Sequence, residues 1–295
     1  MSDTTYCGVV TIVGKPNTGK STLLNALLGV KVAPTSSKPQ TTRLRLRGVW
    51  TEEDRQLIFV DTPGMHNARD VLGRWMVQQI EHSLDGVDLV LWVVDLSRAP
   101  GEEDKLTVQA IRKSGAPVIL VGNKADLTGD PGIALAGYRD LDPGVAEAIA
   151  LSALEGSREV TALRAGLLAR MPEGPFLFPD DIRSDQSREV WAAEIVREVA
   201  MEAVREELPY ALAVQVTDWV ERDDLVEIHA EVIVDKLNHR PMLIGKGGQM
   251  IKRIGQASRK RLEMLLASRV YLGLEVVVRD NWRNDPEALR ELGYR

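Results

Sequence analysis

The stretch Gly14-Lys15-Pro16-Asn17-Thr18-Gly19-Lys20-Ser21 decides how the first half of this chain folds. It follows the apolar run 8–13 and leads into the amphipathic stretch 22–28, so it joins a predicted strand to a predicted helix. The pattern G-x-x-x-x-G-K-[ST] in this setting predicts a phosphate-binding loop, because its backbone N–H groups and the helix N-terminus point at phosphate oxygens. We expect Lys20 to reach the β- and γ-phosphates and Ser21 to offer its hydroxyl to Mg²⁺.

The composition is that of a globular protein with room for two domains. The chain has 295 residues, of which 44% are hydrophobic and 27% charged. Its single cysteine, Cys7, cannot form an internal disulfide, which suits a reducing cytosol. No secretory signal is visible, and apolar runs such as 89–94 are too short to span a bilayer, so we expect a cytoplasmic protein. The net charge of −6 argues against indiscriminate coating of nucleic acid, but it leaves room for a local basic surface.

Two threonines in a polar loop are candidates for a nucleotide switch. Residues 32–43 contain two prolines and no hydrophobic period, so they are predicted to form a surface loop. In a P-loop switch protein, a loop threonine completes the Mg²⁺ shell only while the γ-phosphate is present. Thr42 is the first candidate for this role and Thr41 the second.

A second phosphate motif follows the apolar run 57–60, which ends at Asp61-Thr62-Pro63-Gly64. A strand that delivers an aspartate at its carboxyl end places a carboxylate on the Mg²⁺ shell. Gly64 leaves its N–H free to approach a γ-phosphate. Met65 stands where Ras-type enzymes carry a water-orienting glutamine, so we expect a slow intrinsic rate. His66 is either a water-orienting group or a solvated loop residue.

Strands and helices alternate as far as residue 170. Strands are expected at 89–95, 117–121 and 148–151, and helices at 72–84, 106–111 and 160–170. This alternation predicts an α/β P-loop domain with a mostly parallel sheet, helices on both faces and a ligand at the carboxyl ends of the strands. Asn123-Lys124-Ala125-Asp126 lies at such an end.

The N-K-x-D pattern resembles the guanine-reading motif of GTPases, and its chemistry supports the resemblance. One carboxylate accepts both N1–H and the 2-amino group of guanine, whereas adenine lacks this donor pair and leaves Asp126 unpaired, at a cost of roughly 1–3 kcal/mol. Ser152-Ala153-Leu154 resembles the GTPase loop whose backbone contacts the guanine oxygen. A P-loop kinase that uses ATP is the rival interpretation, which N-K-A-D argues against and nucleotide competition would test.

These motifs define an expected site for GTP and Mg²⁺. The expected GTP-binding residues are Gly14, Asn17, Thr18, Gly19, Lys20, Ser21, Thr22, Asp61, Gly64, Asn123, Lys124, Asp126, Ser152, Ala153 and Leu154. The expected Mg²⁺ ligands are Ser21, Thr42 and Asp61, and the expected catalytic residues are Lys20, Thr42 and Gly64.

A boundary is expected at residues 171–181, which contain three prolines and no hydrophobic period. We expect a GTPase domain over 1–172, a linker over 173–187 and a smaller α+β domain over 188–295. The expected order in this second domain is a helix at 187–208, strands at 211–216 and 226–234, a short helix, a glycine-rich loop, a helix and a strand at 271–278.

The glycine-rich loop Ile244-Gly245-Lys246-Gly247-Gly248 resembles the GXXG loop of KH domains, which clamps about four nucleotides of single-stranded RNA. The element order around it resembles a type II KH domain. Residues 236–261 carry eight basic residues and no acidic one, which favours contact with phosphate. Trp282 either stacks on a base or anchors the C-terminal tail. The expected RNA-binding residues are Ile244, Gly245, Lys246, Gly247, Gly248, Lys252 and Arg253.

Taken together, the motifs resemble the Era family of bacterial KH-domain GTPases over nearly the whole chain. Lys38-Pro39-Gln40-Thr41-Thr42-Arg43 is especially specific to that family, whereas Lys15 and Thr18 stand where it often has Arg and Val. The resemblance implies a GTP-switched factor for small ribosomal subunit maturation that holds the single-stranded 3′ end of the small-subunit RNA on its KH domain. Asn17 matches an asparagine that helps related GTPases hold K⁺, so K⁺-stimulated hydrolysis is a hypothesis. We expect a monomer.

The mechanism implied is a switch in which GTP orders the loop around Thr42 and the segment after Gly64, and this ordering shifts the KH domain. Because such coupling is reciprocal, cognate RNA is expected to raise GTP affinity or hydrolysis. The alternative is a membrane-associated or cell-cycle signalling GTPase, peripheral at the inner face of the cell membrane, whose basic C-terminal domain binds anionic lipid or another partner.

Overall fold

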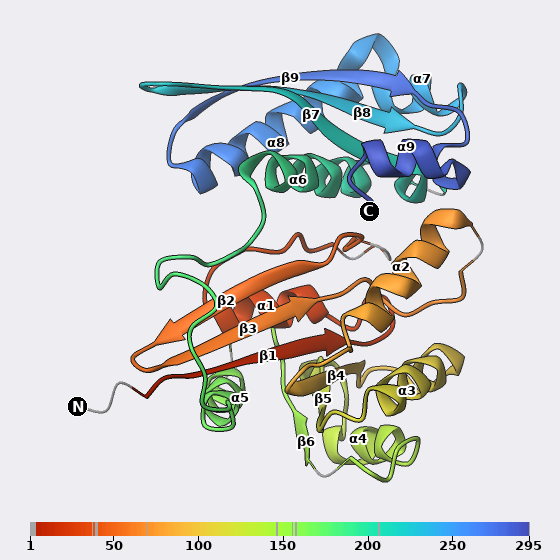
Figure 1. Ribbon diagram of the computed structural model, residues 1–295. Coiled ribbons are helices and arrows are strands. Elements are labelled where there is room, and N and C mark those ends of the chain that lie inside the picture. Colours follow the sequence, from red (N-terminus) through yellow and green to blue (C-terminus); the bar gives the residue numbers. More distant parts are fainter. Residues whose placement is uncertain are drawn as a thin grey trace. The chain divides into compact units, whose positions relative to one another are not determined.

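The computed structural model describes residues 4–36, 38, 41–68, 70–145, 147–154, 156, 158–205 and 207–294. The chain forms two compact units (Figure 1). The first comprises Met1–Thr35, Thr42–Arg69 and Gly73–Asp185, and the second comprises Ser36–Thr41, Asp70–Leu72 and Gln186–Arg295. Three residues of the first-switch region, at positions 37, 39 and 40, lie outside the described residues.

The first unit is built on a six-stranded sheet in the order β2-β3-β1-β4-β5-β6. Its strands are β1 (Tyr6–Val13), β2 (Leu46–Glu52), β3 (Arg55–Asp61), β4 (Leu89–Asp95), β5 (Val118–Asn123) and β6 (Glu147–Ala150). β2 pairs antiparallel with β3, and the other neighbouring strands pair in parallel. The mostly parallel sheet predicted from the alternation of elements is confirmed.

Helices cover both faces of this sheet (Figure 1). They are α1 (Lys20–Leu28), α2 (Val71–His82), α3 (Glu102–Ser114), α4 (Pro131–Arg139) and α5 (Arg158–Leu168). Successive side chains of a strand point to opposite faces, so β4 divides its apolar run between two cores. Leu91 packs in the core that includes α1 and α5, while Trp92 packs in the core that includes α2, α3 and α4.

The parallel strands bring their carboxyl ends to one edge of the sheet. The phosphate loop follows β1, and Asp61, Asp95 and Asn123 are the last residues of β3, β4 and β5. Side chains that are far apart in sequence therefore meet at the place where a parallel sheet binds its ligand.

The second unit has a three-stranded sheet in the order β7-β8-β9, with helices packed on one face (Figure 1). β7 (Leu212–Arg222) is antiparallel to β8 (Leu225–Val234), which is parallel to β9 (Arg269–Val278). The helices are α6 (Arg188–Ala203), α7 (His239–Ile244), α8 (Gln249–Leu266) and α9 (Pro286–Glu291). The order α6-β7-β8-α7-α8-β9 is the predicted order of a type II KH domain.

Two element boundaries differ from the sequence prediction. The helix predicted to reach residue 208 ends at Ala203, where Val204 turns extended, and a 3₁₀ turn over Leu208–Ala211 contains Pro209. Pro209 opens the 3₁₀ turn, but it lies too far along the chain to explain why the α-helix already ends at Ala203, which no local sequence signal marked. The strand predicted to end at residue 216 continues to Arg222 after a β-bulge between Val216 and Asp218. The extra residue of a bulge breaks the alternating pattern that the prediction used.

Trp282 lies inside the second unit. It is fully buried, its ring stacks on Tyr294 with 6.2 Å between centroids, and its Nε1 donates to the Ala211 carbonyl at 3.1 Å. The base-stacking interpretation is therefore wrong, and the tail-anchoring interpretation holds. Among the described residues, no helix has the length and hydropathy that crossing a membrane requires.

Candidate functional site

The phosphate loop curls around the ammonium of its own lysine. Lys20 Nζ donates to the carbonyls of Gly14 and Lys15, each at 3.0 Å, and the Thr18 hydroxyl donates to the Lys15 carbonyl at 3.2 Å. Lys20 is buried, and this desolvation lowers its pKa to about 8. Ser21 and Thr22 follow it in the first turn of α1. The loop thus places a buried cation where the sequence predicts the β- and γ-phosphates.

The three expected Mg²⁺ ligands lie together. The Ser21 hydroxyl donates to Asp61 Oδ2 at 2.6 Å and lies 2.7 Å from the Thr42 hydroxyl, which donates to Asp61 Oδ2 at 3.5 Å. Burial raises the pKa of Asp61, and its Oδ1 is buried without a hydrogen-bond partner in the described part of the chain. One carboxylate and two hydroxyls are hard oxygen donors, so this group fits Mg²⁺, with phosphate and water as further ligands.

No cluster of three or more His, Cys, Asp or Glu side chains that could hold a metal ion occurs in the ranges described.

The segment after Asp61 lies against the phosphate loop. A Cβ on Gly64 would sit 2.6 Å from Pro16 Cα, so a side chain there would displace the loop. Met65 N donates to the Gly14 carbonyl at 3.0 Å, and the Met65 side chain is 5% exposed within an apolar core. That side chain cannot orient a water molecule. His66 Nδ1 lies 3.0 Å from the Gly64 carbonyl, and its role in hydrolysis stays a prediction.

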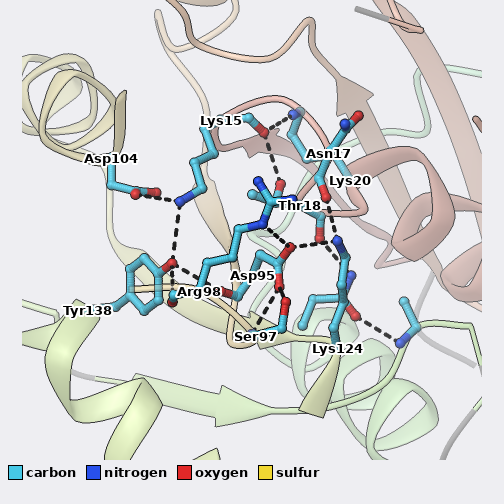
Figure 2. A network of polar contacts seen from close by, with 12 residues as sticks. Lys15, Asn17, Thr18, Lys20, Asp95, Ser97, Arg98, Asp104, Lys124 and Tyr138 are labelled. Carbon is cyan, nitrogen blue, oxygen red and sulfur yellow. Dashed lines mark hydrogen bonds and ion pairs between the residues drawn. The ribbon is translucent and has the colours of Figure 1, made fainter. Parts of the chain in front are cut away.

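The guanine-reading motif also braces the phosphate loop. Asn123 Nδ2 donates to the Thr18 carbonyl at 2.8 Å, and Asn123 Oδ1 accepts from Ala153 N at 3.0 Å. Lys124 Nζ donates to the Asn17 carbonyl at 2.8 Å, as Figure 2 shows. Both residues therefore hold the phosphate loop, and Asn123 also connects it to the loop that follows β6.

The other residues expected to contact the base differ in their exposure to solvent. Asp126 is exposed and makes no hydrogen bond or ion pair to any residue that the structure describes. Ser152 and Ala153 are buried, with the Ser152 hydroxyl lacking a hydrogen-bond partner among the described residues, whereas Leu154 is 84% exposed. A free carboxylate beside ordered backbone N–H groups is what recognition of guanine needs.

Sequence reasoning missed Asp95, the last residue of β4. Its Oδ2 accepts from Lys124 Nζ at 2.6 Å, and its Oδ1 accepts from the Ser97 backbone and hydroxyl (Figure 2). Although burial raises the pKa of Asp95, these bonds hold it below its usual range. The only sequence signal was its place at a strand end, which parallels that of Asp61.

The glycine-rich loop of the second unit separates α7 from α8. Gly245 and Gly248 have φ of +73° and +77°, in the left-handed region that favours glycine. A Cβ on Gly245 would lie 2.7 Å from Met250 Cβ. Lys246, next in the loop, is exposed and makes no ion pair to any residue within the described ranges. The loop therefore presents bare backbone and one cation to solvent.

A groove of about 350 Å³ lies between α8, the helix that follows this loop, and β9. Lys252, Gln256 and Arg259 of α8 and Tyr271 of β9 are among its lining residues. Lys252 and Arg253 are exposed, as the prediction requires. By contrast, Arg261 of the same basic stretch turns to Glu198 and Glu202 of α6, at 2.5 and 2.9 Å. The basic stretch is thus not one continuous solvated surface.

Known proteins share this combination of features. A family model described as "50S ribosome-binding GTPase" matches residues 9–124, and one described as "KH domain" matches residues 207–283. GTPase Era of Deinococcus radiodurans is 53% identical over 298 residues, which cover 99% of this chain and 96% of the relative. The chain belongs to the Era family of GTPases. It is therefore an enzyme that hydrolyses GTP, as its motifs predict.

Other members of the family are similar over the same extent. GTPase Era of Geobacter metallireducens is 42% identical over 299 residues, which cover both chains completely. A crystal structure of Era in complex with MgGDPNP and nucleotides 1506–1542 of 16S ribosomal RNA has a TM-score of 0.93 at 40% identity, covering 98% of this chain and 99% of that one. A crystal structure of an Aquifex aeolicus Era variant bound to GDP.AlF4⁻ has the same TM-score, identity and coverage.

Lys20 predicts a pH dependence of the nucleotide-free protein. Its pKa is about 8 in the folded chain and rises to its ordinary value of about 10.4 on unfolding. Between these values the unfolded chain binds the extra proton, so the free energy of unfolding of the first unit rises from pH 8 to pH 10, by at most about 3 kcal/mol. Urea denaturation across this range measures the slope, and Lys20→Met is expected to flatten it. Equal slopes for the two proteins would contradict the assignment.

Proposed function

We propose that this protein is a GTP-driven switch that binds single-stranded small-subunit ribosomal RNA near its 3′ end through its KH domain and assists small ribosomal subunit maturation. The observation that carries the proposal is the presence, in one chain, of a candidate nucleotide site and a glycine loop with exposed cations at Lys246 and Lys252. Support comes from the similar Era structure, which holds MgGDPNP together with nucleotides 1506–1542 of 16S ribosomal RNA.

For the domains, we propose a GTPase domain over 1–172, a linker over 173–187 and a KH domain over 188–295. In support, α5 ends at Leu168 and α6 begins at Arg188. The first compact unit runs on to Asp185, because the proposed linker packs along its strands, with Gly174 N donating to the Thr5 carbonyl and Val49 N to the Arg183 carbonyl. Limited proteolysis is expected to cut within 173–187, and first cuts inside either domain would contradict the division.

For the nucleotide site, we propose that Asp126 reads the guanine edge while Asn123 and Lys124 hold the phosphate loop in place. Mg²⁺, held by Ser21, Thr42 and Asp61, supplies positive charge to the phosphate oxygens. In this proposal, Lys20 and the Gly64 N–H stabilise charge that develops on the transferred phosphoryl group. The tight approach of Gly64 to Pro16 supports this role of the backbone.

Thr42 separates the GTP state from the GDP state in this proposal. Because its hydroxyl completes the Mg²⁺ shell only with a γ-phosphate present, Thr42→Ala is expected to weaken binding of a non-hydrolysable GTP analogue by about tenfold and GDP binding by less than about twofold. Thr41→Ala is the matched control, since the Thr41 hydroxyl donates to the Lys38 carbonyl at 2.8 Å. Calorimetry measures both affinities. An equal loss for the two nucleotides, or a selective loss in Thr41→Ala, would overturn the assignment.

Two short segments next to the proposed switch residues, Ser36–Thr41 and Asp70–Leu72, belong to the second unit. The Thr41 carbonyl accepts from Arg197 of α6, and Asp70 pairs with Arg283 at 3.2 Å. We propose that GTP orders the chain around Thr42 and after Gly64 and so shifts the KH domain. The RNA is then expected to raise GTP affinity or hydrolysis by the reciprocal effect.

The RNA clamp is tested by charge reversal. Lys246→Glu combined with Lys252→Glu is expected to weaken binding of an oligonucleotide from the single-stranded 3′ end of 16S ribosomal RNA by at least about tenfold. The affinity of the double variant for RNA is also expected to depend less on salt. The slope of log K for binding against log salt concentration should change by about 1.4 for two lost phosphate contacts. Fluorescence anisotropy measures both quantities. Arg188→Glu, at an exposed position on α6, is the control, and GTP hydrolysis without RNA should not change.

Binding that is unchanged in the double variant would contradict the clamp. A protein that binds anionic liposomes but not this RNA, with liposome binding that survives the double change, would favour the membrane-associated alternative instead.

For the cation, we propose that Asn17 helps to hold K⁺ at the phosphates, so that hydrolysis is faster in K⁺ than in Na⁺ at equal ionic strength. Asn17 sits in the loop with φ of +64°, and its carbonyl is fixed by Lys124. Asn17→Ala is expected to remove the difference between the two cations. Equal rates of phosphate release in K⁺ and Na⁺ for the unchanged protein would contradict the proposal.

We also propose that the protein works in the cytoplasm. We further propose that it is a monomer, because one chain supplies all the residues proposed for each site. Light scattering should then give a mass near 32.6 kDa, and twice that mass would contradict this state.

A further inference from the structure

Lys15 occupies a variable position of the phosphate-loop pattern, yet the structure gives it buried partners. Its Nζ lies 2.8 Å from Asp104 Oδ2 and 3.4 Å from Tyr138 Oη, as Figure 2 shows. The Lys15 side chain is 12% exposed and that of Asp104 is fully buried. Burial alone would lower the pKa of Lys15, but the carboxylate of Asp104 raises it above its ordinary value. Lys15 is therefore a charged, inward-facing residue.

The two partners are themselves fixed. Asp104 lies in the first turn of α3, where the helix N-terminus favours a carboxylate, and its Oδ2 also accepts from Gly101 N at 2.8 Å. Tyr138 is fully buried on α4, with its hydroxyl 3.0 Å from the carbonyls of Asp95 and Arg98 (Figure 2). Lys15 thus links the phosphate loop to two helices.

The buried carboxylate of Asp104 depends on Lys15 for its countercharge. Its Oδ1 is buried and has no hydrogen-bond partner among the residues that the structure describes. Removing the ammonium would leave a buried carboxylate without its countercharge, which strongly disfavours the arrangement. The ion pair therefore restricts where Lys15, and the loop that carries it, can lie.

The position of Lys15 matters for the part of the loop that faces phosphate. Lys124 and Asn123 hold the second half of the loop, through the carbonyls of Asn17 and Thr18. The first half is held by Lys15, whose own carbonyl accepts from Lys20 Nζ at 3.0 Å. The pair with Asp104 therefore sets the position of a carbonyl that orients the phosphate-binding lysine.

We propose that Lys15 is a positioning residue for phosphate binding. Through Asp104 and Tyr138 it holds the first half of the loop in the conformation in which the N–H groups and Lys20 face the phosphates. Lys15 does not touch the nucleotide; it acts through the loop. Preorganisation of this kind lowers the cost of ordering the loop when the nucleotide binds.

The test compares release of fluorescent GDP from the full-length protein and its variants. Lys15→Met and Asp104→Asn are each expected to speed GDP dissociation by about tenfold or more, as loss of a buried charge-assisted bond predicts. Combining them should add little, because both remove the same link. The GDP dissociation rate of Lys15→Arg should stay within about threefold of that of the unchanged protein. Lys105→Met is the matched control, since it removes an exposed pair with Glu102 on the same helix.

A second readout separates positioning of the loop from general destabilisation. GDP places a β-phosphate in the loop and GMP does not, so Lys15→Met should reduce GDP affinity several-fold more than GMP affinity. Equal losses for GDP and GMP, or the same GDP release rate in Lys15→Met and Lys105→Met, would overturn the proposal. Far-UV circular dichroism at the assay temperature checks folding. Should Lys15→Met not fold, Asp104→Asn and Lys15→Gln carry the same comparison.

Discussion

The rest of the first unit depends on one constraint: a loop of backbone must stay curled around a buried ammonium until phosphate arrives. Lys20 is buried and donates to the Gly14 and Lys15 carbonyls, which are weaker partners for a cation than an anionic phosphate. Its depressed pKa reflects the cost of this desolvation. A bound phosphate would give Lys20 an anionic partner. Without phosphate, other parts of the chain have to hold the loop in shape.

The sheet supplies that support from several directions. Asn123 and Lys124 reach back from the end of β5 to the second half of the loop, and Lys15 reaches out to α3 and α4. The segment after Asp61 closes another side, with Gly64 packed on Pro16. Because all of these groups lie at the carboxyl edge of a parallel sheet, the residues proposed to recognise the base and those proposed to hold the phosphates share one set of contacts.

The second unit, as proposed, would bind phosphate by the same physical means and with less support. Its GXXG loop offers backbone that carries no side chain at Gly245 and Gly248, and cations at Lys246 and Lys252 that remain exposed. The neighbouring Arg261 is instead held by Glu198 and Glu202, where it serves the packing of α8 on α6. Charge in the basic stretch is therefore divided between a solvent-facing part and a structural part.

The sequence by itself determined the motifs, the parallel sheet, the type II KH order and the residues expected around GTP, because motif chemistry and strand periodicity are local properties. The sequence also predicted that Ser21, Thr42 and Asp61 lie together. The phosphate loop marked Ser21 and the end of an apolar run marked Asp61, whereas Thr42 was the first of two candidates in a polar loop. Only the tertiary structure decided that Lys15 meets Asp104 and Tyr138, which lie 89 and 123 residues away. It also decided that Trp282 is buried and that β7 continues past its bulge. These features depend on packing between residues that are far apart in the sequence. The sequence around a tryptophan or a lysine does not say whether its side chain will contact solvent, ligand or protein.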